Sequence, residues 1–324
     1  MLLTTLIILA VFLAIFGVIA IIDLATAKKR KEVYRLKHSL TAYLMLLPAL
    51  ILAFLFVLLP ILYSLGYSFT DFRLTKPNDI NFIKFENFSQ FFLEVSQKGT
   101  LYHAIKNTAI FVVGVVPLQI GLALLLALFV NRQGVGAKIF KVCFFAPVVI
   151  SLSVTSYLWL QILSPSESGM LNAFLGIFGA SPRDWLGDPK TAMPCIILLS
   201  AWQGCGYQML IFLSGLSNIR KELYEAASLD GANGWQKFTT VTWPGLRSTF
   251  VYVIITVFIG ACRILTQPML MTGYKDHTVT LSYYMYQQGY TYRWVGYSSA
   301  VALIMTIFIG TITLIQRRVL REKN

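Results

Sequence analysis

Residues 107–130 read NTAIFVVGVVPLQIGLALLLALFV, a run of 24 residues that contains no charged side chain. A helix needs about 20 mostly apolar residues to cross the hydrocarbon core of a bilayer, so this run is long enough to do so. Six further runs share its length and character, namely residues 2–22, 42–66, 139–163, 193–216, 250–271 and 296–316. The sequence therefore predicts an all-α integral membrane protein with about seven transmembrane helices.

The composition excludes an ordinary soluble protein. Of the 324 residues, 56% are hydrophobic and 13% are charged, whereas a soluble domain keeps about a quarter of its residues charged. The net charge of +13 would suit a nucleic-acid or anionic partner, but it also arises in membrane proteins because basic residues collect in cytoplasmic loops. We favour the second explanation and expect no nucleic-acid partner.

The basic residues are distributed unevenly between the two sides that seven spans would create. One side carries 17 Lys and Arg residues, in the segments 28–38, 131–141, 217–249 and 317–324. The other side carries 8 over a greater total length, in the segments 67–104, 164–192 and 272–295. Since the side richer in Lys and Arg usually faces the cytoplasm, we expect the N-terminus outside and the C-terminus in the cytoplasm.

The first apolar run is predicted to be a retained anchor. The tripeptide at residues 25–27, Ala-Thr-Ala, resembles a signal-peptide cleavage site, but the run before it is longer than a typical signal peptide and has no basic residue ahead of it. Four basic residues follow it instead, at 28–31. We therefore expect an N-terminal anchor helix and a basic cytoplasmic segment in residues 1–40, and a transmembrane domain in residues 41–324.

The chain carries no catalytic or cofactor motif. It lacks the G-x-x-x-x-G-K-[ST] loop that cradles ATP phosphates, and no loop combines paired carboxylates, a Ser-His-Asp set or a Cys-His set. The four cysteines form no C-x-x-C pair, and His38, His103 and His277 lie far apart in the sequence. We expect a chain without enzymatic activity, metal or cofactor of its own.

The polar segment 217–245 holds the most informative motif. Residues 225–231 read EAASLDG, and Pro244 follows before the next apolar run. We predict a short helix over residues 219–230 that ends at Gly231, as at a C-cap. Residues three or four positions apart would share one face of it: Leu223, Ala226, Ala227 and Asp230. Spacing alone leaves open whether this helix is an amphipathic connector or a docking surface.

This segment resembles the EAA loop of binding-protein-dependent ABC importer permeases, which reads E-A-A, three residues, Gly, nine residues, an aliphatic residue, any residue, Leu and Pro. The positions that match are Glu225, Ala226, Ala227, Gly231, Val241 and Pro244. Trp243 stands where the pattern has Leu, and we expect this departure to alter packing without abolishing docking.

The resemblance covers nearly the whole chain after residue 40. It is to the carbohydrate branch, the larger partner of the maltose and multiple-sugar permease pairs. Supporting stretches are Asn107-Thr108, Pro117-Leu118-Gln119 and Phe144-Phe145-Ala146-Pro147. One departure is that residues 272–276 read TGYKD, where relatives often carry TGGGP. The resemblance implies a six-helix type I ABC importer core with one additional N-terminal helix.

An assembly of several chains in the bacterial inner membrane is also implied by the resemblance. Its partners would be a second homologous permease subunit, two ATPase subunits that bind ATP and Mg²⁺, and an extracytoplasmic solute-binding protein that delivers a carbohydrate. The coupling loop would dock on an ATPase subunit through Glu225, Ala226, Ala227, Asp230 and Gly231. The alternative for Glu225 is structural, because an acid near a helix start stabilises the helix by only a few tenths of a kcal/mol.

Polar residues within the apolar runs are candidates for a substrate path, because a polar group in lipid is costly and usually faces the bundle interior. They stand near Gly and Pro residues, which we expect to expose backbone groups to a ligand. The resemblance adds the positions that correspond to the ligand contacts of maltose-type relatives. The full set of candidates is Ser151, Leu152, Ser200, Gln203, Gly204, Tyr207, Ala261, Arg263 and Gln267. Most of these positions differ in chemistry from the relatives, so we expect a different sugar.

Arg263 is the charged member of this set. An arginine at the middle of a membrane costs roughly 2.5–3.5 kcal/mol even on a lenient insertion scale, so something must compensate for it. One hypothesis is an anionic substrate, such as an acidic saccharide or a sugar phosphate, bound by the guanidinium. The alternatives are pairing with the partner permease, and a position from which the side chain reaches the membrane interface.

Other functions remain open from the sequence. An importer of a sugar phosphate or a polyol would share the same fold, and a secondary transporter or a membrane scaffold would also consist of apolar helices. The coupling loop favours an ATP-driven importer, because a scaffold has no need of Glu225 or Gly231.

Overall fold

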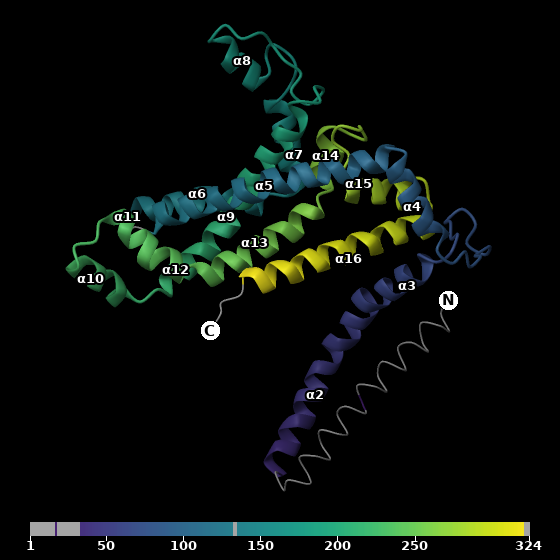
Figure 1. Cartoon of the computed structure of the whole chain (residues 1–324), viewed down its shortest axis with the longest axis horizontal. Helices are drawn as coiled ribbons and strands as arrows, with labels where there is room; N and C mark the ends of the chain where they lie inside the picture. Colours follow the sequence, from purple (N-terminus) through teal and green to yellow (C-terminus); the bar gives the residue numbers. More distant parts are fainter. Residues whose placement is uncertain (1–16, 18–32, 132–134, 321–324) are drawn as a thin grey trace. The chain divides into compact units, whose positions relative to one another are not determined.

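The computed structural model describes residue 17 and residues 33–131 and 135–320 of the chain (Figure 1). Apart from residue 17, the predicted anchor run 2–22 lies outside the described residues, as do the basic residues 28–31. The described part is helical and holds no strand beyond an isolated bridge between Thr70 and Phe82, which confirms the all-α class. It contains four helices that are long and apolar enough to cross a membrane, or up to six spans if each of two bent helix pairs is counted as one.

The chain divides into two compact units, one comprising residues 1–87 and 295–300 and the other residues 88–294 and 301–324. In the first unit, α2 (Val33–Ala53), the π-helical turn η1 (Phe54–Leu58) and α3 (Leu59–Tyr67) follow one another directly. Their apolar part, Thr41–Tyr67, is a 27-residue candidate span that confirms the predicted run 42–66. The wide π-helical turn lies just before Pro60, whose ring would clash with a carbonyl one turn earlier in a regular α-helix.

Hydrogen bonds hold the loop that follows α3. The Nδ2 group of Asn87 donates to the carbonyl oxygens of Ser68 and Thr70, both at 2.9 Å. The amide of Gly296 donates to the carbonyl oxygen of Phe72, also at 2.9 Å. A Cβ at position 296 would lie 2.1 Å from the Thr70 carbonyl oxygen, so the close approach requires glycine there.

The core of the second unit is a packed pair of long helices, α5 (Thr100–Val130) and α9 (Ala192–Ser217), with α13 (Arg247–Cys262) against both (Figure 1). These helices confirm the predicted runs 107–130 and 193–216. Buried residues of α5 recur at intervals of three or four and form a core-facing stripe: Leu101, Ala104, Thr108, Phe111, Val115, Gln119, Ala123, Ala127 and Val130. The small Ala side chains in this stripe allow the neighbouring backbone to approach closely.

Helix α16 (Val295–Leu320) confirms the predicted run 296–316. Within the second unit its Met305 packs with Phe258 and Cys262 of α13. Short helices of this unit include α4 (Glu86–Ser96), α8 (Met170–Gly176), α10 (Lys221–Leu229), α14 (Thr266–Met271), α15 (Leu281–Tyr286) and the π-helical η3 (Gln287–Thr291).

The prediction of one continuous helix over residues 139–163 is wrong. Helices α6 (Val135–Val149) and α7 (Leu152–Ile162) meet at an angle of 101°. Just after Pro147, residue Ser151 has an extended backbone, and its side chain caps α7 by accepting a hydrogen bond from the Val154 amide at 3.3 Å. Ser151 therefore starts a new helix inside an apolar run that gives no sign of a break, because a capping serine satisfies the first free amides of a helix.

The predicted run 250–271 is also divided. Helix α13 ends at Cys262, and α14 begins at Thr266 after three intervening residues, with Pro268 in its first turn. A proline is tolerated there, where its missing N–H breaks no helical hydrogen bond, but it prevents the helix from continuing unbroken through that position. At its other end, α13 meets the segment formed by α11 (Gly234–Lys237), η2 (Phe238–Thr242) and α12 (Trp243–Gly245) at 66°.

The segment between α14 and α15 is tied to α5. The Nδ2 group of Asn107 donates to the carbonyl oxygens of Asp276 and Val279, at 2.8 and 2.9 Å. Tyr274, which stands where relatives often have glycine, packs edge-on against Tyr283 with ring centroids 5.2 Å apart. Burial raises the pKa of the Tyr274 hydroxyl, and its neighbours Tyr292 and Asp276 raise it further. The departure from the pattern of the relatives therefore adds an aromatic contact to this loop.

Candidate functional site

A cavity of about 760 Å³ lies within the second unit, between α5, the α6–α7 junction, α9 and the α13–α14 junction. Its wall combines apolar side chains with amides, hydroxyls and a guanidinium. The polar side chains of the wall are Gln119, Ser151, Ser200, Gln203, Gln208, Thr256, Arg263, Thr266 and Gln267. Its volume and mixed lining are typical of sites for small organic ligands.

The fold brings together all but one of the residues predicted for a substrate path. Those that line the cavity are Ser151, Leu152, Ser200, Gln203, Gly204, Ala261, Arg263 and Gln267. Tyr207 is not among the lining residues, and half of its surface is exposed. The substrate-path role of the whole set stays a prediction.

Gln203 links α9 to the break between α6 and α7. Its Nε2 group donates to the carbonyl oxygen of Ile150 at 3.3 Å and to the hydroxyl of Thr155 at 3.2 Å. Its side chain is 7% exposed, and the buried Oε1 atom has no hydrogen-bond partner among the described residues. A buried acceptor without a donor is costly, so this oxygen is an exception among the buried polar groups of the structure.

A second amide contact crosses the cavity wall between α5 and α9. The Nε2 group of Gln119 donates to Oε1 of Gln208 at 3.0 Å. Gln119 packs directly over Gly204, where a Cβ would lie 2.2 Å from the Nε2 atom. Gly204 therefore provides the space in which this buried pair of amides forms.

The expectation that glycines near the candidate residues expose backbone groups is wrong for Gly204 and Gly206, which do not interrupt their helix. Helix α9 runs unbroken from Ala192 to Ser217. At Gly206 a Cβ would lie 2.3 Å from the carbonyl oxygen of Phe144 in α6. Both glycines serve close packing, and the backbone breaks that open onto the cavity are at Ile150–Ser151 and at residues 263–265 instead.

Two polar wall residues had not been predicted to bind substrate: Gln119 and Thr256. A signal for Gln119 and Thr256 was present, since each is a polar residue inside a long apolar run. Whether such a residue faces the cavity or the lipid depends on the rotation of its helix, which only the packing of neighbours determines.

Arg263 directly follows the last residue of α13, and its backbone amide donates to the carbonyl oxygen of Gly260 at 3.1 Å. Its exposed side chain is the only charged group among the residues that line the cavity in the described part of the chain. No carboxylate of the described residues pairs with it. The C-terminal end of a helix carries partial negative charge, which stabilises a cation at this position.

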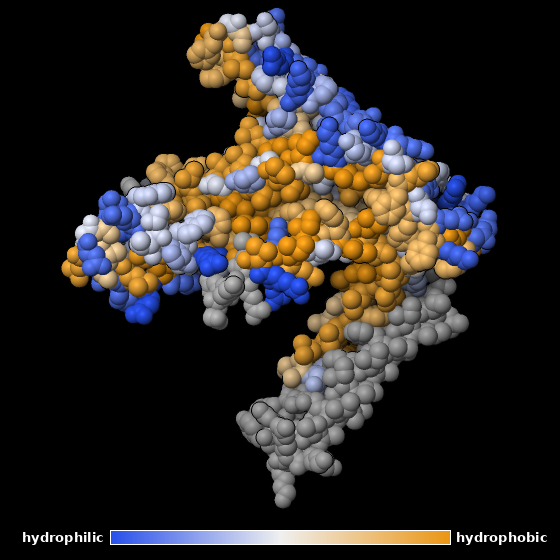
Figure 2. Space-filling model, viewed as in Figure 1, coloured by the Kyte–Doolittle hydropathy of each residue, from blue (hydrophilic) through white to orange (hydrophobic). Residues whose placement is uncertain are grey.

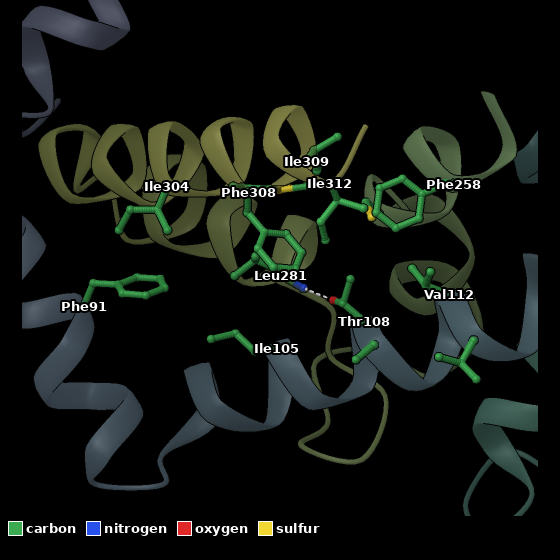
Figure 3. Close-up of a pocket in the computed structure, with 14 residues that line it drawn as sticks. Phe91, Ile105, Thr108, Val112, Phe258, Leu281, Ile304, Phe308, Ile309 and Ile312 are labelled. Atoms are coloured by element: carbon green, nitrogen blue, oxygen red, sulfur yellow. Dashed lines mark hydrogen bonds between the residues drawn. The ribbon is translucent and has the colours of Figure 1, made fainter. Parts of the chain in front are cut away.

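A separate pocket of about 370 Å³ lies between α5, α13 and α16 (Figure 3). Its lining side chains, among them Val112, Phe258 and Phe308, are almost entirely apolar, and the Leu281 amide donates to the Thr108 hydroxyl at 2.8 Å. Because this pocket offers no free polar group to a hydroxylated ligand, we do not assign it to the substrate path.

The short helix predicted over residues 219–230 is confirmed as α10 (Lys221–Leu229). Gly231 follows in a left-handed conformation, with φ of +75°. The Ala232 amide donates to the Ala227 carbonyl at 2.9 Å, and the Gly231 amide donates to the Ser228 carbonyl at 3.1 Å. These two bonds form a Schellman motif, which explains why glycine occupies this position.

Helix α10 has one attached side and a broad exposed side. The Tyr224 hydroxyl lies 2.9 Å from that of Thr242 and fastens the helix to η2. Glu225 and Ala226 are exposed, as is the apolar Leu229, 90% of whose surface is accessible. A single exposed apolar side chain does not identify a protein contact, and docking of this helix on another chain stays a prediction.

The surface of the second unit is consistent with a lipid environment. Large apolar side chains on α5 and α16 are exposed, including Val113, Leu125 and Ile307, and Figure 2 shows hydrophobic residues over much of the visible helical surface. Polar residues gather on the segment around α8 and on α10. Within the described ranges, no group of three or more His, Cys, Asp and Glu residues could hold a metal ion.

Residues 91–323 match the family described as "Binding-protein-dependent transport system inner membrane component". The arabinooligosaccharides transport system permease protein AraP of Bacillus subtilis (strain 168) is 32% identical over 277 residues, which are 84% of this chain and 86% of that protein. The lactose transport system permease protein LacF of Rhizobium radiobacter is 31% identical over 298 residues, 89% of this chain and 96% of that protein.

Among solved structures, this chain is similar to a chain of the bacterial alginate ABC transporter, with a TM-score of 0.77. That transporter was crystallised in complex with an alginate pentasaccharide-bound periplasmic protein. The match covers 89% of this chain and 96% of that chain, at 23% sequence identity. This similarity shows a shared fold, which confirms the predicted fold class; the predicted boundary at residue 40 stays a prediction.

Proposed function

This chain belongs to the family of binding-protein-dependent transport system inner membrane components, and from this premise we propose that it is the permease subunit of an ATP-driven importer of a carbohydrate. The observation that carries the proposal is the cavity of about 760 Å³, with amides and hydroxyls in its wall, inside a bundle of membrane-spanning helices. Polar groups are expensive at this depth, so their concentration around one cavity points to a passage for a polar solute.

The chemistry of the wall supports a carbohydrate as that solute. Sugar hydroxyls both donate and accept hydrogen bonds, and the wall offers both kinds of group. Gln203 lines the wall from α9, and the hydroxyl of Ser151 and the amide of Gln267 stand at the two helix breaks that open onto the cavity. The relatives include permeases named for arabinooligosaccharides and for lactose, which supports an oligosaccharide.

The importer we propose contains further chains. A second homologous permease would complete the translocation path, two ATPase subunits would bind ATP and Mg²⁺, and an extracytoplasmic binding protein would deliver the sugar. The exposed α10 is the surface that we assign to an ATPase subunit, with Glu225, Ala226, Ala227, Asp230 and Gly231 as its contact residues. Movement of a docked ATPase would then be transmitted through η2 and α12 to α13, which lines the cavity.

A transport assay on the complete complex tests the proposal. The complex would be reconstituted into vesicles with its binding protein, and uptake of labelled oligosaccharides would be measured with and without ATP. ATP-dependent uptake with sugar-stimulated ATP hydrolysis supports an importer. Uptake by this chain that persists without ATP and without ATPase subunits would instead establish a secondary transporter, and absence of transport under every condition would favour a scaffold.

Glu225→Lys is the sharpest variant for the coupling surface. Reversal of this exposed charge is expected to lower ATP-dependent uptake at least about tenfold, equivalent to about 1.4 kcal/mol, without dissociating the permease pair. Glu222→Lys is the matched control, since Glu222 is an exposed glutamate on the same helix that lies outside the proposed contact set. Equal loss of uptake in both variants would mean that Glu225 has no specific role.

A further inference from the structure

We propose that the cavity binds a carbohydrate that carries an anionic group, and that Arg263 receives this group. The inference rests on the proposed function and adds the charge class of the substrate to it. It rests on one observation: the guanidinium of Arg263 lines a cavity whose described wall contains no acidic side chain.

The position of Arg263 is set by the end of α13. The helix stops at Cys262, and Arg263 begins the three-residue break that leads into α14. Both flanking segments contribute to the cavity wall, through Ala261 on one side and Gln267 on the other. The guanidinium therefore stands at a backbone break that opens onto the cavity.

The charge of Arg263 is uncompensated within the part of the chain that the structure describes. It is the only charged side chain among the lining residues, and none of the described carboxylates pairs with it. The negative end of α13 stabilises this cation only slightly, and the exposed side chain leaves the guanidinium accessible from the cavity. A bound oxyanion would supply the missing counter-charge.

The remaining polar wall suits the neutral part of such a ligand. Ser200 and Gln203 of α9 line the cavity and provide polar side chains for contact with sugar hydroxyls. Gln119 and Gln208 satisfy one another through the 3.0 Å hydrogen bond between them and contribute no charge. The wall thus provides hydroxyl recognition on α9 and oxyanion recognition at the end of α13. A planar guanidinium can bind a carboxylate or a phosphate through two parallel hydrogen bonds.

The experiment uses the complete complex with its binding protein in vesicles. Three probes are compared by the concentration that half-maximally stimulates ATP hydrolysis: a uronic-acid trisaccharide, the carboxyl-reduced neutral trisaccharide of the same linkage, and a sugar phosphate. The two acidic probes distinguish a carboxylate from a phosphate as the source of the charge. We expect one acidic probe to stimulate the wild-type complex and the neutral counterpart to be much weaker.

Arg263→Gln then tests the residue. We expect it to raise the half-maximal concentration of the acidic probe about 10- to 100-fold, the effect of losing one charge-assisted hydrogen bond, and to remove most of the preference over the neutral probe. Arg263→Lys should retain part of the preference. Arg247→Gln is the matched control, because Arg247 is an exposed arginine at the opposite end of the same helix and does not line the cavity.

The outcomes separate this inference from the function on which it rests. Stimulation by neutral sugars alone would overturn the anionic substrate and leave the carbohydrate importer in place. If Arg263→Gln leaves the stimulation of ATP hydrolysis by the acidic probe unchanged, Arg263 has a structural role, such as pairing with the partner permease. The same conclusion follows if the variant loses assembly and basal ATP hydrolysis equally with every probe. A complex that responds to no saccharide would overturn the proposed function as well.

Discussion

Gly206 shows how a single missing atom sets the distance between two helices. A Cβ at this position would lie 2.3 Å from the Phe144 carbonyl oxygen, and a backbone atom of α6 cannot rotate away as the end of a side chain can. We expect Gly206→Ala to force α6 and α9 apart, at the cost of about 1–3 kcal/mol that is typical of overpacking. The apparent unfolding temperature of the purified complex would fall, as measured by tryptophan fluorescence.

The control for this prediction is Gly121→Ala on α5, because no atom lies within 4 Å of the Cβ that it would add. Alanine is the better helix former by about 1 kcal/mol, so this variant should be as stable as the wild type or more so. An unfolding temperature for Gly206→Ala equal to that of the control would show that α6 yields easily at this contact.

At the scale of one element, α10 depends on how it ends. Gly231 adopts a φ of +75°, which a residue with a Cβ occupies only at a cost of about 1–2 kcal/mol. Gly231→Ala should therefore weaken the two hydrogen bonds that close the Schellman motif. We expect faster hydrogen exchange at the amides of residues 231 and 232, and weaker coupling to ATP hydrolysis as a consequence.

Gly234→Ala is the appropriate comparison for the α10 prediction. Gly234 begins α11 three residues later, and no neighbouring atom would meet its Cβ. Gly234 is not among the described glycines that have a positive φ. Alanine should therefore be accepted there without strain. Identical exchange in the two variants would imply that α10 is held by its contact between Tyr224 and Thr242 rather than by its C-terminal turn.

At the scale of the whole molecule, the distribution of charge predicts how the chain crosses the membrane. Segments assigned to the cytoplasmic side carry 17 basic residues and the others carry 8. In a background without the native cysteines, Glu167→Cys should react with a membrane-impermeant thiol reagent in cells whose outer membrane is permeabilised. Leu229→Cys should react only after the inner membrane is opened. Both native residues are exposed, so accessibility within the protein does not limit either reaction. The reverse pattern would invert the topology.

The sequence by itself determined the class, the family and the places of most spans in this protein, because apolar length and charge bias are properties of local composition that survive any detail of packing. It also located α10 and its terminal glycine, since the φ of Gly231 is a local requirement. Only the tertiary structure decided that residues 139–163 and 250–271 are broken, that Gly204 and Gly206 serve packing within an unbroken helix, and that Gln119 joins the cavity wall while Tyr207 does not. Some of these outcomes depend on which face of each helix packs against a neighbour that is distant in the sequence. Others depend on a local capping hydrogen bond, such as the one that Ser151 accepts, which starts a new helix although the apolar pattern continues.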